Sequence, residues 1–479
     1  MLVRGNRTRY FVALLENHSE RRGSMGIEWS APRGSMPDGA WHTVACPRLR
    51  AESDLSQDLA QGEAFALRIG NLQAIASVYG GDFADSVSSQ VLASLQVFIA
   101  SDPHVFGKIC SRATGVFDLV LAARDSTDGV GRAQCRQKVA IWCSAIGRRA
   151  LAFGARSVHV LASALTAGSM AGDQGLPGEC LLAQAHARLE CAQICAMARL
   201  DGFDGYQRDM AIVAELYEQL NRDQLQFAWK PVRHLENDTS LYYRGMLSAL
   251  QADGGAGEWD VSRKAMHRLG LTAAFDQHAL LQAIDLLAGS EVGPIAVAVA
   301  ASSFQSLCWW EPVLARLRAC RSLGRRLFIA IDGTCAFVSV SAAAALADEL
   351  RALGCVIVFE RMGNDNGSIA SLLALRPDVI TIEAMFLRLT LESARDLDLL
   401  RHLLGVAMAI APVVVLEGVD TRALAKNAIV VGGLWGTGEH VGAARWILPR
   451  CPATGAAWHV NVDHFRRQLA LPRYVGERA

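Results

Sequence analysis

The chain has 479 residues, 51% of them apolar and 20% charged, and its 47 basic residues balance its 47 acidic residues. Such a length predicts two or three domains, and the apolar fraction excludes a chain that is mostly disordered. Because the net charge is zero, no overall field attracts the protein to nucleic acid or to an acidic membrane. We therefore predict no nucleic-acid partner.

The composition also bears on the compartment. No segment reaches the ~18 uninterrupted apolar residues that a membrane helix needs, and the N-terminus lacks the apolar stretch of a secretion signal. The 12 cysteines are scattered without the paired spacing of a metal site, which is typical of a reducing compartment. We expect a cytoplasmic protein with no membrane span and no cofactor.

The first half of the chain predicts an arm followed by a small mixed domain. Residues 1–60 are rich in Arg, Ser, Gly and Pro and lack periodicity, which indicates a flexible N-terminal arm. Residues 61–207 alternate between strand and helix patterns, an order typical of an α+β, ferredoxin-like domain. Strands are expected at 65–69, 104–109, 116–122 and 157–165, and helices at 72–99, 134–147 and 179–200.

The second half predicts a barrel. A linker helix is expected at 208–222, and residues 223–452 carry a series of strands separated by helices, the signature of a TIM-type barrel. Functional residues of such barrels lie at the C-terminal ends of the strands. Residues 453–479 are expected to form a tail. Barrel strands are expected at 227–232, 295–299, 327–331, 356–359, 379–382 and 413–416, with helices such as 338–353 and 369–375 between them.

Two stretches of the first domain resemble the GGDEF family of diguanylate cyclases. Residues 69–80 resemble the segment that opens the family's domain, and residues 181–202 resemble its closing helix. The family's Mg²⁺-binding aspartate falls on Arg68 and its second aspartate on Gly70, and the acidic pair of its signature falls on the Val and Phe at 116–117. Hard cations need oxygen ligands. The resemblance therefore implies a degenerate GGDEF domain with the nucleotide-cyclase-like fold and no catalytic site.

Residues 215–450 more strongly resemble the EAL family of cyclic di-GMP phosphodiesterases. Residues 220–232 match its opening helix and strand, and residues 414–421 are close to its Glu-Gly-Val-Glu-Thr strand. The family holds two metals with carboxylates and an Asn, and it uses a catalytic Lys. The remaining Glu360 and Glu417 cannot hold two metals, so the resemblance implies an EAL barrel that is not an enzyme. At the family's ligand and lysine positions the chain carries Arg244, Ala298, Ala330, Arg361 and Thr381.

The resemblance leaves a candidate residual pocket at the barrel mouth. If Arg244 and Arg361 point into it, we expect them to pair with Glu360, Glu383 or Glu417 in place of metal. The two arginines, together with Lys230, would also suit phosphate groups. The pocket residues are predicted to be Lys230, Arg244, Glu360, Arg361, Asp378, Glu383 and Glu417.

The function that the resemblance implies is that of a catalytically inactive regulatory protein of cyclic di-GMP-type signalling, acting through a protein partner. The alternative is a receptor that binds cyclic di-GMP in the EAL pocket without hydrolysing it. An active phosphodiesterase is disfavoured because several metal ligands and the lysine are replaced together. A homodimer through the EAL domain is left open. Trp309 and Trp310 either cover the core or form an exposed anchor for a partner.

Overall fold

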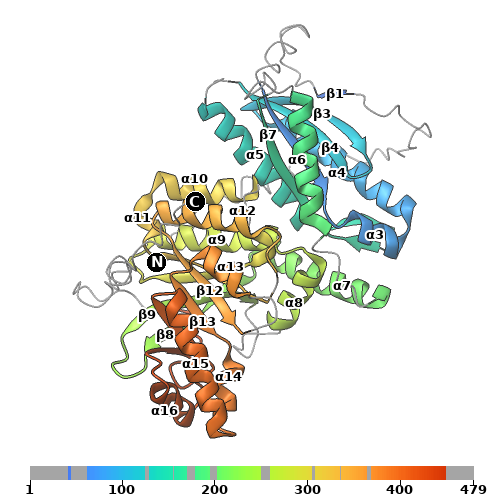
Figure 1. Cartoon of the computed structure of the whole chain (residues 1–479). Helices are drawn as coiled ribbons and strands as arrows, with labels where there is room; N and C mark the ends of the chain where they lie inside the picture. The colour runs from blue at the N-terminus through green and yellow to red at the C-terminus, as the bar shows by residue number, and fades with distance from the viewer. Residues whose placement is uncertain are drawn as a thin grey trace, which may run out of the picture. The chain divides into compact units, whose positions relative to one another are not determined.

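The computed structural model describes ten stretches of the chain, drawn in colour in Figure 1. Residues 1–40 and 449–479 lie outside these stretches. Most of the predicted arm and all of the predicted tail therefore fall outside the description. The described residues are 41–44, 62–124, 129–154, 156–169, 178–194, 202–249, 259–304, 308–334, 336–363 and 368–448.

The first domain, called here the sheet domain, is an antiparallel five-stranded sheet with helices on both faces. The alternating side chains of β2 divide between these faces. Phe65 and Leu67 pack with the core that includes α4 and α5, whereas Ala64 and Ala66 pack against Leu182 and other residues of α6. The strand order is β1 (Trp41–Val44), β3 (Val105–Ala113), β4 (Val116–Ala123), β2 (Glu63–Ile69) and β7 (Ala162–Ser169). The helices are α3 (Leu72–Tyr79), α4 (Gly81–Ser101), α5 (Gly129–Arg148) and α6 (Gly178–Ile194), and a small hairpin consists of β5 (Leu151–Phe153) and β6 (Arg156–Val158).

Two local differences from the predicted elements have simple causes. The helical pattern at 72–99 is divided into α3 and α4 at Gly80, whose φ of 99° is a left-handed conformation that favours glycine and ends the first helix. Residues 41–44, which fall within the predicted arm, form β1 and pair antiparallel with β3. A strand of only four residues leaves little periodic signal in the sequence.

Helix α4 has the length and apolar character of a membrane span, and it is the one helix of the described residues that does. Its buried residues recur at a spacing of four, at Val87, Val91, Leu95 and Ile99, and belong to the hydrophobic core. Length and composition alone are weak evidence for a span, because a core helix meets the same test.

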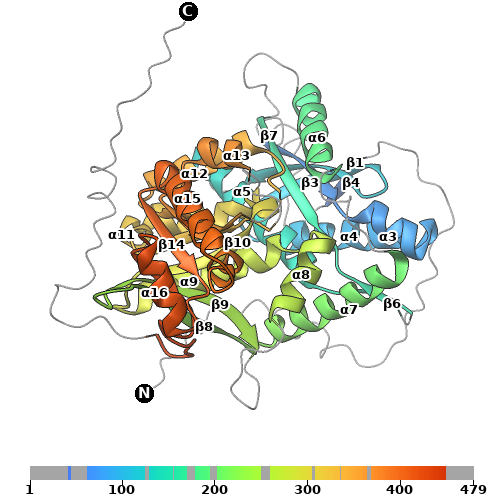
Figure 2. The ribbon, with the colours of Figure 1, turned by 60° about the horizontal axis from the view of Figure 1, so that its bottom comes forward.

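The barrel domain is a closed eight-stranded barrel surrounded by helices, as the sequence predicts (Figure 2). One strand departs from the predicted order, because β8 runs antiparallel to both of its neighbours, β9 and β15. Only the short segment 235–239 joins β8 to β9, and a parallel pair would need a longer crossover. The strands in barrel order are β10 (Ile295–Ala300), β11 (Leu327–Asp332), β12 (Val356–Met362), β13 (Val379–Ile382), β14 (Val413–Glu417), β15 (Trp435–Thr437), β8 (Leu225–His234) and β9 (Ser240–Ala249).

Helices cover the outside of the barrel, and side chains such as Phe328, Val358 and Val415 fill its interior. Figure 2 shows α15 beside β14. The longer helices are α8 (Trp259–Leu269), α9 (Ala273–Gly289), α10 (Glu311–Ala319), α12 (Val340–Ala352), α15 (Ala394–Ile410) and α16 (Arg422–Val430), and the shorter ones are α11 (Arg321–Gly324), α13 (Ile369–Leu375) and α14 (Ala384–Leu389).

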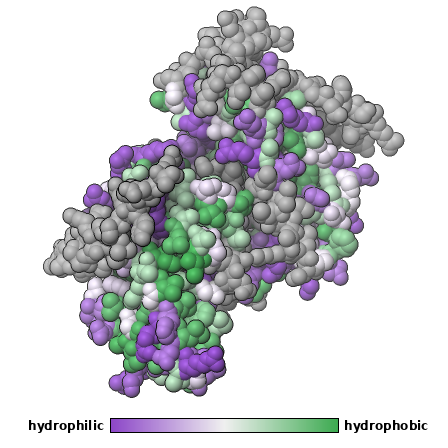
Figure 3. Space-filling view, in the orientation of Figure 1, coloured by the Kyte–Doolittle hydropathy of each residue, from purple (hydrophilic) through white to green (hydrophobic). Residues whose placement is uncertain are grey.

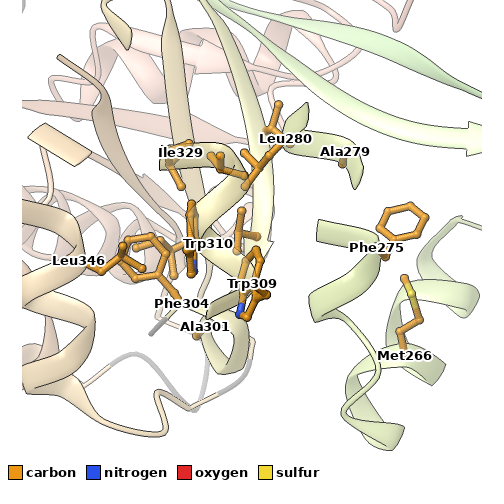
Figure 4. Close-up of a cluster of buried hydrophobic side chains, with 14 of the residues drawn as sticks. Met266, Phe275, Ala279, Leu280, Ala301, Phe304, Trp309, Trp310, Ile329 and Leu346 are labelled. Atoms are coloured by element: carbon orange, nitrogen blue, oxygen red, sulfur yellow. The ribbon is translucent and has the colours of Figure 1, made fainter. Parts of the chain in front are cut away.

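The structure supports the interpretation that the two tryptophans cover the core rather than form an exposed anchor. Trp309 and Trp310 are 7% and 1% exposed, and their ring centroids lie 4.6 Å apart. Figure 4 shows them in the buried cluster with Phe304, Leu280 and Ile329. The indole N–H of Trp310 donates to the backbone oxygen of Ser303 at 3.1 Å. Neither ring is therefore free to anchor a partner.

The linker helix is longer than predicted. Helix α7 spans Gly202–Asn221, so it begins six residues before the expected 208. Its buried side chains, among them Tyr206, Met210 and Tyr217, belong to the continuous core that also holds residues of the sheet domain and of the barrel. The helix is thus packed along its length.

Candidate functional site

Charged side chains gather where the parallel strands of the barrel end, a region called here the mouth. Arg244 lies on β9, Asp332 ends β11, Glu360 and Arg361 lie near the end of β12, and Glu417 ends β14. The register of β11 and β12 sets Asp332 directly beside Glu360. Two neighbouring buried carboxylates repel each other, so each requires its own positive partner.

Glu360 obtains that partner from Arg244. The guanidinium Nε and Nη2 of Arg244 donate to the two oxygens of Glu360 at 2.6 and 2.7 Å, a two-point ion pair. Glu360 is only 1% exposed. Burial by itself would lower the pKa of Arg244, but the adjoining Glu360 carboxylate outweighs it and the pKa of Arg244 is raised. Arg244 is therefore a permanent cation fixed in place at the mouth.

Asp332 is held by cations from two different elements. Nη2 of Arg361 donates to its Oδ2 at 2.8 Å, and Nε of Arg263, from α8, donates to the same oxygen at 3.0 Å. Nε2 of His267, one turn further along α8, lies 3.6 Å from it. Burial opposes ionisation of Asp332, but His267, Arg263 and Arg361 together hold its pKa well below its usual range. Asp332 is thus charged throughout the neutral range.

A hydrogen-bonded chain links β12, β13 and β14. The backbone of Arg361 has a φ of 61°, a left-handed conformation that non-glycine residues seldom adopt. Its N–H donates to Oγ1 of Thr381 at 2.9 Å, and the Thr381 hydroxyl donates to Glu417 at 2.6 Å. Burial raises the pKa of Glu417 to about 7, with Arg244 opposing the shift and Glu360 adding to it. Glu417 therefore titrates near neutral pH.

Residues 213–444 match the family model of the EAL domain. This part of the chain is an EAL domain. The match covers the linker helix from its middle onward and the whole described barrel, and it agrees with the closed eight-stranded topology.

Several solved structures are similar to the chain at low sequence identity. The FimX EAL domain from Pseudomonas aeruginosa bound to c-di-GMP is 19% identical, with 50% of this chain and 98% of that chain covered and a TM-score of 0.43. The S helix–GGDEF–EAL portion of LapD from Vibrio cholerae, in its apo form, is 14% identical over 80% of this chain and 92% of that chain, with a TM-score of 0.43. No curated protein matches the chain.

Four of the predicted pocket residues come together at the mouth of the EAL domain, namely Arg244, Glu360, Arg361 and Glu417. Of the predicted ion pairs, Arg244 with Glu360 forms. Arg361 pairs instead with Asp332. The strand register explains this choice, because Asp332 lies beside Glu360, the residue that precedes Arg361, and Glu360 is already engaged by Arg244.

The other three predicted residues lie at different distances from this cluster. Lys230 is the register partner of Arg244 on β8, and its Nζ lies 3.1 Å from Glu439. Glu383 follows β13 and is partly exposed, with no ion pair to it among the described residues. Asp378 does not belong to the pocket, because it precedes β13 and so lies at the opposite end of the barrel. There its carboxylate accepts a hydrogen bond from the backbone N–H of Ile357 at 2.8 Å. This bond joins the beginnings of β12 and β13.

Asp332, Arg263 and His267 were not predicted from the sequence. The position of Asp332 at the C-terminal end of a barrel strand was a usable signal, since that is where functional residues of such barrels lie. Arg263 and His267 are four residues apart and share a helix face, but nothing local indicates which strand that face meets.

The residues at the mouth do not fit a two-metal site. Ala298 and Ala330, which face each other in the β10–β11 register, offer only methyl groups. Arg244 and Arg361 add positive charge and already occupy two carboxylates. Within the described stretches, no group of three or more His, Cys, Asp or Glu side chains is placed to hold a metal ion. The ion pairs neutralise the carboxylates as a metal otherwise would.

The sheet domain has a cavity of its own, of about 360 Å³. It brings together Arg68, Gly70 and Val116, three positions that the sequence marks as replaced metal-site residues, with Asp85 and Thr114 on its wall. The guanidinium of Arg68 lies 3.3 Å from Glu190 of α6, which also lines the cavity. A cation thus lies where the GGDEF resemblance would require a carboxylate.

A buried charge cluster beneath α6 was likewise not predicted. Asp118 on β4 is 3% exposed and accepts from Nε of Arg112 at 2.5 Å, and its other oxygen lies 2.7 Å from Nε2 of His186. Burial opposes the charge on Asp118, but His186 and Arg112 outweigh it and lower the pKa of its carboxyl. The cluster fastens α6 to the sheet.

Proposed function

We propose that this chain is a catalytically inactive, cytoplasmic regulatory protein of cyclic di-GMP-type signalling, and that it acts by presenting its domains to a protein partner. In the same proposal the sheet domain is a degenerate GGDEF domain. One observation carries the proposal. Arg244, at the place of the glutamate that names the EAL signature, forms a two-point ion pair with Glu360.

The chemistry of phosphodiester hydrolysis supports this proposal. The reaction requires divalent metals that activate water and stabilise the charge on phosphate oxygens. A guanidinium cannot ligate a metal, and Arg244 also uses the Glu360 carboxylate that could have done so. Restoring one ligand would still leave Ala298 and Ala330 without donor atoms.

A second candidate function, a receptor that binds cyclic di-GMP without cleaving it, is favoured by the cations at the mouth. Lys230 and Arg244 are register partners on β8 and β9, and Arg361 lies on β12 nearby, joined to the cluster through Asp332. Phosphate oxygens could replace the carboxylates as partners of these side chains. Such binding must compete with the Arg244–Glu360 pair, which lowers the affinity expected for it.

Calorimetric titration of the full chain with cyclic di-GMP, with and without Mg²⁺, tests both functions when the product is assayed in parallel. The regulatory proposal expects no cleavage under either condition and no heat of binding. Binding without cleavage, lost in Arg244→Ala and kept in the control Arg316→Ala, would establish the receptor instead. Arg316 is a suitable control because it pairs with Asp285 on the exposed outer helices. Mg²⁺-dependent cleavage would overturn both.

A further inference from the structure

Three basic side chains of helix α8 contact two different parts of the molecule. Arg263 and His267 are one turn apart and both approach Asp332 at the mouth, at 3.0 and 3.6 Å. Arg268, the next residue, lies about 100° further round the helix. It donates from Nε and Nη2 to both oxygens of Asp209 on α7, at 2.6 Å each.

At the mouth, α8 supplies part of the charge that Asp332 needs. Asp332 is 1% exposed, and its Oδ2 accepts from Arg263 of α8 as well as from Arg361, so cations from two elements hold this buried carboxylate. Arg263 is itself buried, at 5% exposed, so its guanidinium also depends on Asp332. A shift of α8 would therefore disturb Asp332 and, through it, the side chain of Arg361.

On its other side, α8 contacts α7, a helix that also packs against the sheet domain. The backbone N–H of His159 donates to Sδ of Met210 on α7 at 3.2 Å, and the His159 ring stacks on Tyr217 with centroids 4.8 Å apart. The Tyr217 hydroxyl donates to the backbone oxygen of Leu271, just after α8, at 2.7 Å. Helix α7 is thus fixed on one side by the sheet domain and on the other by α8.

We propose that α8 is a coupling element that transmits the position of the linker helix α7 to the charge network of the barrel mouth. The path runs from Asp209 through Arg268, along one turn of α8 to Arg263 and His267, and on to Asp332. The proposal rests on the proposed function in one respect, since it takes the mouth as the regulated site.

Hydrogen–deuterium exchange of the full chain, followed by mass spectrometry, tests the coupling without any ligand. In Asp332→Asn we expect exchange to rise several-fold in α8 and in residues 202–214 of α7, because α8 loses the charge that holds it. The control is Glu360→Gln, which breaks the other ion pair of the mouth. It should raise exchange in β9 and β12 and leave α7 unchanged.

The reciprocal variant, Arg268→Gln, works from the other end and spares the buried core, since the Arg268 side chain is 36% exposed. Exchange should then rise at 330–334 and 360–363. The proposal would be overturned if Glu360→Gln raised exchange in α7 as much as Asp332→Asn does. It would also be overturned if Arg268→Gln raised exchange only in α7 and α8. Because no nucleotide is added, these outcomes are independent of whether the protein binds or cleaves cyclic di-GMP.

Discussion

The guanidinium of Arg244 and the carboxylate of Glu360 meet through two hydrogen bonds of 2.6 and 2.7 Å, although 116 positions separate them in the sequence. Removing one partner of a buried pair leaves an uncompensated charge, whereas replacing both with apolar groups is often tolerated. We expect Glu360→Gln to lower the free energy of unfolding by about 3 kcal/mol. Urea denaturation followed by circular dichroism measures this change.

The double variant Arg244→Met, Glu360→Met is the internal control for that prediction. It should be closer to the wild type in stability than Glu360→Gln is, because no buried charge is left. If the double variant were as unstable as the sum of its two single changes, the pair would not be the interaction that stabilises the mouth.

Metal ions should not affect the stability of this protein. A metal ion that bound only the folded state would raise the Tm. Because we propose that the mouth binds no metal, we expect Mg²⁺, Mn²⁺ or EDTA to leave the Tm of the wild type unchanged. Arg244→Glu should behave in the same way, since Ala298 and Ala330 still supply no ligands. Differential scanning fluorimetry is sufficient for both. A variant that combines Arg244→Glu, Ala298→Asn, Ala330→Glu and Arg361→Asp is the positive control and should gain a Mn²⁺-dependent rise in Tm.

Glu417 should make stability depend on pH near neutrality. Its pKa in the folded protein is about 7, above the usual value of 4.5, so the folded state retains a proton that the unfolded state releases. The stability that protonated Glu417 contributes is fully present below pH ~4.5 and is lost as pH rises through ~7. Between pH 5 and 8 we expect the unfolding free energy of the wild type to fall by on the order of 1–2 kcal/mol relative to that of Glu417→Gln. Denaturation at several pH values measures this, and Glu439→Gln, at an exposed position, should show no such difference.

Asp118 should have the opposite pH dependence. His186 and Arg112 lower its pKa, so its charged form stabilises the fold above its ordinary pKa, and that contribution is lost as pH falls through the lowered value. At pH 7 we expect Asp118→Asn to reduce stability by about 1–3 kcal/mol, with the difference narrowing in acid. Asp85→Asn is the matched control, because Asp85 accepts an exposed hydrogen bond from Thr114 and should change stability little. A difference for Asp118→Asn that stayed constant down to acid pH would contradict this assignment.

The sequence predicts the elements of the barrel well because their signals are local. The strand at 379–382 and the helix at 369–375 have the predicted limits, since apolar runs and helical spacing are properties of neighbouring residues. The predicted helix at 72–99 failed at Gly80, where a single backbone conformation divides it. The antiparallel direction of β8 follows from its short connection to β9, whereas its pairing with β15 depends on how the barrel closes, which no short window of sequence contains.

The sequence by itself determined which side-chain types stand at the mouth. Arg244, Ala298 and Ala330 carry no side-chain oxygen atom, the ligand that hard cations require. The sequence also predicted that Arg244 would find a carboxylate there.

Only the tertiary structure decided the partners. Arg361 pairs with Asp332 rather than with Glu383 or Glu417, because strand register places Asp332 beside Glu360, the residue that precedes Arg361. Asp378 lies at the opposite end of the barrel because it precedes β13, a position that the predicted strand at 379–382 already implied. On the outer surface, Figure 3 shows hydrophobic residues gathered over the middle of the barrel domain. Ion pairing depends on distances between elements far apart in the chain, and those distances exist only once the barrel has closed.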